Sequence, residues 1–222
     1  MLRAVSYNIH SGRDLFWRKR LEQMVQALRE IQPDAIALQE VHQNPKYGYQ
    51  ADYIAEQLDY QVVFAPSIAL AGGYYGNAFL TRLPIHDTKV ISLPAKREKR
   101  TLLDVSVKWE GRDISIWNTH CSLNKASRFY QLQLLMTLTS QQLELPRLVL
   151  GDFNASSISF SPYYIDCAMA HGKENLHTLP AFRRRLDYIF VSQHWDVCRY
   201  DLYPIAWSDH LPVIVDLRLH DA

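Results

Sequence analysis

The sequence predicts an α/β fold in which two mixed, mainly antiparallel sheets pack face to face and helices cover the outer surfaces. Three observations support this class. Strand patterns outnumber helical patterns several to one. A run of strands without helices between residues 76 and 119 is antiparallel in character. Helical stripes, by contrast, occur in residues 18–31 and 127–143. No linker or internal repeat interrupts the chain, so we expect one domain spanning residues 1–222.

The predicted elements follow from apolar periodicity and from turn residues. In residues 18–31, Leu21, Met24, Val25, Leu28 and Ile31 fall three and four positions apart, which indicates an amphipathic helix that ends before Pro33. Further helices are predicted at 51–58, 127–143 and, in part, 163–170. Strands are predicted at residues 5–9, 34–41, 61–64, 76–80, 88–93, 101–109, 112–119, 147–150, 186–191, 197–203 and 213–219.

Composition excludes several classes of protein. The 24 Lys and Arg residues nearly balance the 23 Asp and Glu residues, unlike the basic surplus of a dedicated nucleic-acid binder. No apolar stretch approaches the ~20 residues needed to span a bilayer. The first eight residues predict a strand, not a signal peptide. Three widely spaced cysteines, Cys121, Cys167 and Cys198, favour reduced thiols in a cytoplasmic protein.

Polar side chains recur where the predicted strands end. Open sheets collect their chemistry at such positions, so several of them together are more informative than any one. A single carboxylate there more often caps a loop. The set comprises Asn8, Glu40, Asn118, His120, Asp152, Asn154, Asp187, Asp209 and His210. Carboxylates, amides and imidazoles without a cysteine cluster suit Mg²⁺ or Mn²⁺, with one or two ions, better than structural zinc. Such a site readily promotes attack of water on a phosphate.

The order of seven motifs resembles the endonuclease/exonuclease/phosphatase superfamily, the DNase I-like metal-dependent phosphoesterases. The motifs are Tyr7-Asn8-Ile9-His10, Leu38-Gln39-Glu40-Val41, Gly76-Asn77-Ala78-Phe79-Leu80, Asn118-Thr119-His120, Gly151-Asp152-Phe153-Asn154, Arg185-Leu186-Asp187-Tyr188-Ile189 and Ser208-Asp209-His210. The resemblance covers nearly the whole chain and is closest to short bacterial phosphoesterases. It implies a four-layered α/β/β/α sandwich.

The resemblance also implies a role for each site residue. Glu40 would be the principal metal ligand, with Asn8 close by and Asp209 completing the shell. Asp187 would orient His210 beside the phosphate, and His120 would donate a proton to the leaving oxygen or stabilise it. Asn154 would donate a hydrogen bond to the phosphate, and Asp152 would position the attacking water or bind metal. Two alternatives exist for the group that activates the water, namely the Asp187–His210 pair and Asp152.

Substrate binding is expected from Arg100, Asn77 and Asn118, although Asn118 also fits a purely supporting role. Two basic runs, 96–100 and 183–185, are either solvated faces or a positive rim for a phosphate-bearing substrate. Loop tyrosines at 47, 49, 74 and 75 fit core packing better than stacking on a base or a lipid interface. For His10 and His42 we expect solvated or capping positions.

These features predict a Mg²⁺- or Mn²⁺-dependent hydrolase of a small or lipid-linked phosphodiester. The alternative is a nuclease acting on DNA or RNA, and a less favoured one is an inactive scaffold of the same fold. A phosphate ester is the expected partner. Nucleic acid is an alternative substrate. A membrane lipid is expected only as a substrate and not as a binding partner, and no obligate protein partner is indicated.

Overall fold

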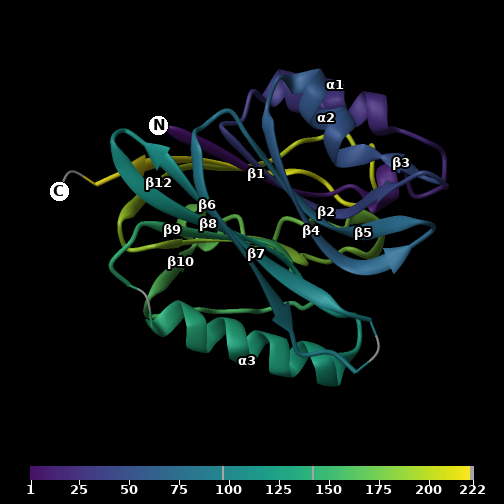
Figure 1. The fold of residues 1–222 in the computed structure, drawn as a ribbon. Helices are drawn as coiled ribbons and strands as arrows, with labels where there is room; N and C mark the ends of the chain where they lie inside the picture. The colour runs from purple at the N-terminus through teal and green to yellow at the C-terminus, as the bar shows by residue number, and fades with distance from the viewer. Residues whose placement is uncertain (97, 142, 221–222) are drawn as a thin grey trace.

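Two β-sheets pack face to face and helices cover their outer faces, as Figure 1 shows in this computed structural model. The structure describes residues 1–220 except Arg97 and Gln142. Those two residues fall in the first basic run and in the predicted helix 127–143, so these parts of the predictions lie outside the described residues.

The first sheet has seven strands and holds both ends of the described chain. Its order is β12-β13-β1-β2-β5-β4, with β3 paired to β2. The strands are β1 (Leu2–Asn8), β2 (Ala35–Asn44), β3 (Gly48–Tyr49), β4 (Gln61–Leu70), β5 (Gly73–Thr81), β12 (Trp195–Leu202) and β13 (Val213–Leu219). Strands β1 and β2 are parallel and the other pairs are antiparallel.

The second sheet has six strands in the order β10-β11-β9-β8-β7-β6. They are β6 (Ile85–Leu93), β7 (Arg100–Trp109), β8 (Arg112–His120), β9 (Arg147–Asp152), β10 (Tyr164–Asp166) and β11 (Asp187–Ser192). Only β8 and β9 are parallel within this sheet. Each sheet therefore contains one β-helix-β crossover, because parallel neighbours need a long connection.

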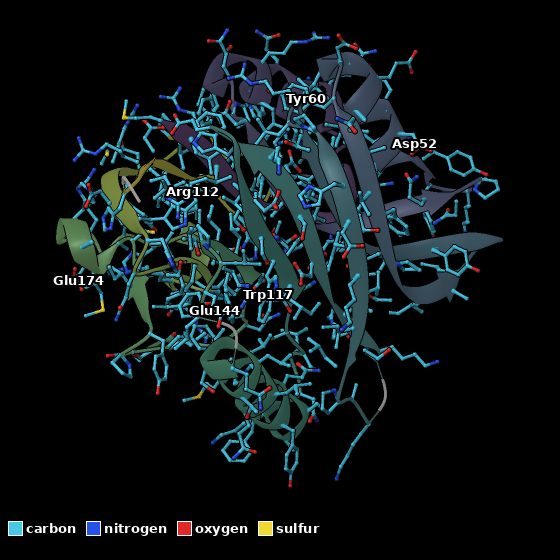
Figure 2. The ribbon with its side chains drawn as sticks, turned by 60° about the vertical axis from the view of Figure 1, so that its left-hand side comes forward. Asp52, Tyr60, Arg112, Trp117, Glu144 and Glu174 are labelled. Carbon is cyan, nitrogen blue, oxygen red and sulfur yellow. The ribbon has the colours of Figure 1, made fainter. Side chains whose placement is uncertain are left out.

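Three apolar clusters divide the molecule into four layers. Phe79, Leu150 and Val215 belong to the core between the sheets. Helices α1 (Leu21–Ile31) and α2 (Gln50–Leu58) cover the first sheet at the top of Figure 1. Helix α3 (Lys125–Gln141) covers the second sheet at the bottom. Trp117, labelled in Figure 2, lies on the face of the second sheet that packs against α3. The predicted α/β/β/α sandwich is confirmed.

The start of α1 differs from the prediction for a local reason. The helix begins at Leu21 instead of residue 18, because Arg18 and Arg20 bind the carboxylate of Asp14 in the preceding loop. It ends at Ile31, followed by Gln32 in a left-handed conformation and then by Pro33. Three short 3₁₀ helices occur at η1 (His10–Gly12), η2 (Met169–His171) and η3 (Pro180–Phe182).

Of the residues 163–170 that were predicted to be partly helical, only the last two lie in a helix, the 3₁₀ helix η2. Tyr164, Ile165 and Asp166 form the edge strand β10, antiparallel to β11. Their burial alternates with the period of two that a strand requires, and Asp166 is held by Arg185. Strands β4 and β5 are also longer than predicted, because Ala71 and Gly72 both take positive φ and close a tight hairpin.

No helix in the described part of the chain is long and apolar enough to cross a membrane. The three cysteines are free thiols, of which Cys121 and Cys167 are buried and Cys198 is exposed.

Candidate active site

The register of three neighbouring strands places the predicted site residues at one level. His120 at the end of β8 pairs with Asp152 at the end of β9, and Asp152 in turn pairs with Asp187 at the start of β11. Gly151 makes this close approach feasible, because a Cβ there would lie 1.9 Å from the carbonyl oxygen of Thr119. The sequence motifs thus converge through strand pairing.

A bulge in β2 turns Glu40 toward the same place. The register of β2 against β5 shifts between Leu38 and Val41, and Glu40 has a φ of 60°. Bulges re-aim side chains next to active sites, which a regular strand would direct alternately to its two faces. The Glu40 side chain keeps 23% of its surface exposed, whereas that of Asp152 keeps 2%. Glu40 is therefore the more open of these two carboxylates.

Asn8 joins the two sheets at the site. Its Nδ2 lies 3.1 Å from Glu40 Oε1 and 3.1 Å from Asp152 Oδ2, and its Oδ1 accepts the backbone N–H of His10. One amide therefore donates to two carboxylates that come from different sheets. It presents nitrogen, not oxygen, toward them, so the structure shows Asn8 as a bridge between acids.

His210 lies between two carboxylates. Its Nδ1 is 2.7 Å from Asp187 Oδ2, and its Nε2 is 3.9 Å from Asp152 Oδ2. Burial alone would lower the pKa of His210, but Asp187, with further charge from Asp152 and Asp209, raises it to about 10. Burial, together with the charge of Asp187, raises the pKa of Asp152 to about 7. The site is short of positive charge.

His120 lies on the other side of Asp152 and has the opposite electrostatic environment. Arg100 Nη1 lies 2.9 Å from its Nδ1, while its Nε2 is 3.5 Å from Asp152 Oδ2 and 3.1 Å from Asn154 Nδ2. Burial, followed by the charges of Arg100 and His210, holds the pKa of His120 well below its usual range. A guanidinium can only donate hydrogen bonds, so Nδ1 accepts and Nε2 of the neutral ring carries the proton. The Asn154 amide nitrogen beside Nε2 is then a neighbouring donor, which binds the Cys121 carbonyl, and not a hydrogen-bond partner of the ring.

Asp209 lies at the rim of the site. Its Oδ1 accepts a hydrogen bond from Ser208 Oγ at 3.1 Å and lies 3.7 Å from His10 Nδ1. His10 was expected to be solvated or capping, but it faces this acid and contacts the ring of Trp17. His42, for which a solvated or capping position was also expected, is buried, because its ring stacks on Tyr47 and contacts the ring of Tyr75.

Asn77 and Asn118, two of the predicted substrate-binding residues, are both buried between the sheets. Asn118 is fully buried, and its amide donates to the carbonyls of Leu38 and Ala78 and accepts from Gln39. Asn77 is 2% exposed and donates to the carbonyl of Thr101. Both amides therefore link the two sheets to each other.

In each basic run, one arginine is paired with groups inside the protein. Arg100 is buried between His120 and Glu98, with Nη2 3.0 Å from the Glu98 carboxylate. Arg185 is paired with Asp166 and lies over the Tyr188 ring. Each run contributes one arginine that points inward because a buried acid or ring receives it.

Two residues that support the site, Thr178 and Tyr75, lie outside the seven sequence motifs. Thr178 is fully buried, and its Oγ1 accepts the backbone N–H groups of Leu186 and Asp187, which fixes the start of β11. Tyr75 lies beside Glu40, and burial with the charge of that acid raises its pKa. The only sequence signal for Tyr75 was its place immediately before the Gly76–Leu80 motif, whereas Thr178 had none.

The donor set fits a divalent cation. Asp152, Asp187 and His210 each offer a ligand atom within 4.8 Å of the others, and Asp187 Oδ1 has no hydrogen-bond partner among the described residues. With Glu40 and Asp209, the site gathers four carboxylates around the cations His210 and Arg100. Hard oxygen donors and excess negative charge are what Mg²⁺ and Mn²⁺ select.

Phosphoesterases and nucleases of one class share this architecture. In that class, two mixed sheets pack face to face and an acid–imidazole cluster lies at their strand ends. The chain belongs to the Endonuclease/Exonuclease/phosphatase family, whose sequence profile matches residues 5–210. The comparison with curated proteins finds none that matches.

Solved structures share the fold. An endonuclease/exonuclease/phosphatase from Beutenbergia cavernae is 22% identical over 98% of this chain and 71% of its own, with a TM-score of 0.80. D. rerio TDP2 complexed with single strand DNA product is 18% identical over 98% of both chains, with a TM-score of 0.80. The human Nocturnin catalytic domain with bound sulfate anion is 25% identical over 99% of this chain and 93% of its own, with a TM-score of 0.76.

Proposed function

We propose that this protein is a divalent-metal-dependent phosphodiesterase that hydrolyses a small or lipid-linked phosphodiester by in-line attack of water. The observation that carries the proposal is the junction at Asp152. Its carboxylate lies within 3.9 Å of the Asn8 amide, the His120 ring and the His210 ring. A buried acid between two imidazoles of opposite protonation provides separate groups for the attacking and leaving oxygens.

We assign Glu40 and Asp209 to the metal, and the buried carboxylate of Asp187, whose Oδ1 has no hydrogen-bond partner among the described residues, is a further candidate oxygen donor. Bound Mg²⁺ or Mn²⁺ would supply the positive charge that neutralises a phosphate oxygen. The Asn8 amide, which donates to Glu40 and Asp152, keeps the two acids aligned from opposite sheets. Asn8 is thus a positioning residue in this proposal.

His210 acts as an imidazolium in our proposal. Its raised pKa keeps both ring nitrogens protonated near neutral pH, with Nδ1 donating to Asp187. Nε2 is then free to donate to a phosphate oxygen, and a protonated ring cannot accept the proton of water. This favours Asp152, whose pKa of about 7 suits a group that takes a proton near neutral pH, as the acceptor.

His120 stabilises the leaving oxygen in our proposal. The ring is neutral and Arg100 occupies Nδ1, so Nε2–H is the group available to the departing alkoxide. A hydrogen bond aimed at developing charge in a buried site is an effective form of catalysis. Asn154, 3.1 Å from the same nitrogen, borders the oxygen from the other side.

A groove beside Arg100 supports a small or lipid-linked ester group. It has a volume of about 680 Å³ and is lined by Ile68, Tyr74, Leu93, Lys99 and Arg100, among other residues. Mixed apolar and cationic walls next to the phosphate position suit the organic part of a phosphodiester.

A nuclease is the second candidate. Its support is the structural similarity to TDP2, which was solved with a single strand DNA product. Binding of DNA or RNA that falls steeply with salt would favour this candidate over the first. An inactive scaffold would bind no divalent metal and would hydrolyse no phosphodiester.

The test measures hydrolysis of bis-p-nitrophenyl phosphate with Mg²⁺ and with Mn²⁺, then of phospholipids, phosphomonoesters and oligonucleotides. We expect metal-dependent turnover that is lost in Glu40→Gln and in His210→Gln with the fold intact. The matched control is Asp216→Asn, an acid paired to Arg3 at the far end of the first sheet. Full activity of His210→Gln, or turnover unaffected by a chelator, would contradict the proposal.

A further inference from the structure

The loop between η1 and α1 presents three large apolar side chains to solvent. Leu15, Phe16 and Trp17 are 42%, 72% and 63% exposed, and they are consecutive in the sequence. We call these three residues the apolar tip. Single exposed apolar residues are ordinary on protein surfaces, whereas a contiguous group indicates an interaction surface.

A buried acid at the base of the loop holds the tip outward. Asp14 is 5% exposed, and its Oδ1 accepts the backbone N–H groups of Phe16 and Arg18 at 2.9 and 3.0 Å. Its Oδ2 accepts Nε of Arg18 and Nε of Arg20 at 2.8 and 3.1 Å. The backbone N–H of Trp17 also binds the Asp14 carbonyl. The loop is therefore ordered by polar bonds at its base, and its apolar side chains take no part in the core.

Cations surround the apolar tip. Residues 13–20 contain four basic side chains, Arg13, Arg18, Lys19 and Arg20, and one acid, Asp14. The Arg18 guanidinium lies 5.1 Å from the centre of the Phe16 ring. An apolar tip with a basic collar complements a bilayer surface, where apolar groups enter the acyl boundary and Lys and Arg remain at anionic headgroups.

The apolar tip is beside the candidate active site. The ring of Trp17 is 4.8 Å from that of His10, and His10 Nδ1 is 3.7 Å from Asp209 Oδ1. Arg20 lies 5.7 Å from the centre of the Trp207 ring, in the loop that also exposes Ile205. A membrane or macromolecule that bound the apolar tip would therefore also contact the rim of the candidate active site at Asp209.

We propose that the apolar tip inserts into the interface of an anionic phospholipid bilayer and holds the Asp209 rim against the headgroups. A lipid surface is favoured over single-stranded nucleic acid because Leu15 has no ring on which a base can stack. Docking itself is independent of hydrolysis. The inference that a phospholipid headgroup supplies the phosphodiester rests on the function proposed above.

The first experiment is sedimentation of the whole protein with vesicles of phosphatidylglycerol and phosphatidylcholine. Leu15→Ser with Phe16→Ser removes two side chains of the tip and leaves Trp17, which contacts His10, in place. We expect this double variant to bind vesicles at least roughly tenfold more weakly, because it loses the apolar area that would enter the membrane. The matched control is Phe129→Ser with Tyr130→Ser on α3, where both side chains are 56% exposed.

Trp17 provides a second measurement. It is the only tryptophan of the five that is mainly exposed, since Trp117 and Trp195 are buried and Trp109 and Trp207 are half-buried. Insertion should shift its emission to shorter wavelength, and lipids brominated on the acyl chain should quench it. Trp17→Phe should remove most of both responses.

Three outcomes would overturn the docking proposal. They are absence of vesicle binding, equal loss of binding in the α3 control, and a tip variant that loses affinity for an oligonucleotide but not for vesicles. Turnover of bis-p-nitrophenyl phosphate reports on the proposed function separately. The Leu15→Ser with Phe16→Ser variant should retain that turnover. Vesicle binding without turnover would refute only the enzymatic proposal.

Discussion

The two ends of the parallel pair β1 and β2 both contain buried carboxylates, but they differ in how these charges are matched. At the amino end, Arg3 Nε and Nη2 lie 2.6 and 2.9 Å from the two oxygens of Asp216. Asp34, just before β2, accepts the backbone N–H of Arg3 and the guanidinium of Arg82. Each acid there has a basic partner with well-directed hydrogen bonds.

At the carboxyl end of the same strands, acids outnumber cations. Asn8 donates one neutral amide to both Glu40 and Asp152, and the pKa of Asp152 rises because burial and Asp187 oppose its ionisation. A matched buried pair becomes costly when one partner is removed, whereas an unmatched group of acids gains when a cation binds. The comparison teaches that function lies where the charge balance is incomplete.

The largest effect should come from removing the central acid. Asp152→Asn should lower turnover of a phosphodiester by about 10²–10⁴-fold, the range for loss of a general acid or base. At pH 8 without metal, the variant should be at least as stable as the wild type, because it no longer buries an ionised carboxylate. Turnover assays and thermal melts together check this. If the variant is active and less stable than the wild type, the carboxylate of Asp152 serves stability and not catalysis, and the proposed difference between the two ends of β1 and β2 is wrong.

Removing Asp34, a buried acid that has a basic partner, should lower the stability of the protein and leave turnover unchanged. Asp34→Ala leaves the Arg3 backbone N–H and the Arg82 guanidinium without their acceptor and should lower the free energy of unfolding by about 3 kcal/mol. Urea unfolding measures the loss. Turnover per folded molecule should not change, since Asp34 lies at the opposite end of β2 from Glu40. A selective loss of turnover would show that the two ends are coupled.

Metal binding should stabilise the folded protein only through the carboxyl end of β1 and β2, where acids outnumber cations. At a Mg²⁺ or Mn²⁺ concentration of 100 times its Kd, the free energy of unfolding should rise by about 2.7 kcal/mol. Glu40→Gln should reduce this gain and Asp34→Ala should not. Melting temperatures with and without a chelator measure the difference. Equal gains in both variants would place the cation elsewhere on the molecule.

The unmatched charges should also make stability depend on pH when no metal is bound. The folded-state pKa of Asp152 is about 7, above its ordinary value of 3.8, so the folded state retains a proton that the unfolded state releases. The free energy of unfolding should therefore fall as pH rises from about 4 to 7. His210, with its pKa raised from 6.5 to about 10, should extend the fall toward pH 10. Melts of Asp152→Asn and His210→Gln across these windows should be flatter than those of the wild type.

The sequence by itself determined the elements, the order of the motifs and the class of site. Apolar periodicity located α1 and most strands, because burial on one face of an element imposes a repeat that residue types display directly. Polar residues at strand ends indicated hard metal ligands, because coordination preference depends on the atoms that a side chain offers. His120, Asp152, Asp187 and His210 were all found in this way and lie together.

Only the tertiary structure decided which of these polar side chains reach the site. All four asparagines Asn8, Asn77, Asn118 and Asn154 are buried, yet Asn77 and Asn118 donate to backbone carbonyls of the opposite sheet, whereas Asn8 donates to two carboxylates of the site. Glu40 reaches it because β2 bulges, and the protonation of His120 and His210 depends on neighbours distant in sequence. Such properties follow from distances between chain segments, which residue identity and spacing along the chain do not specify.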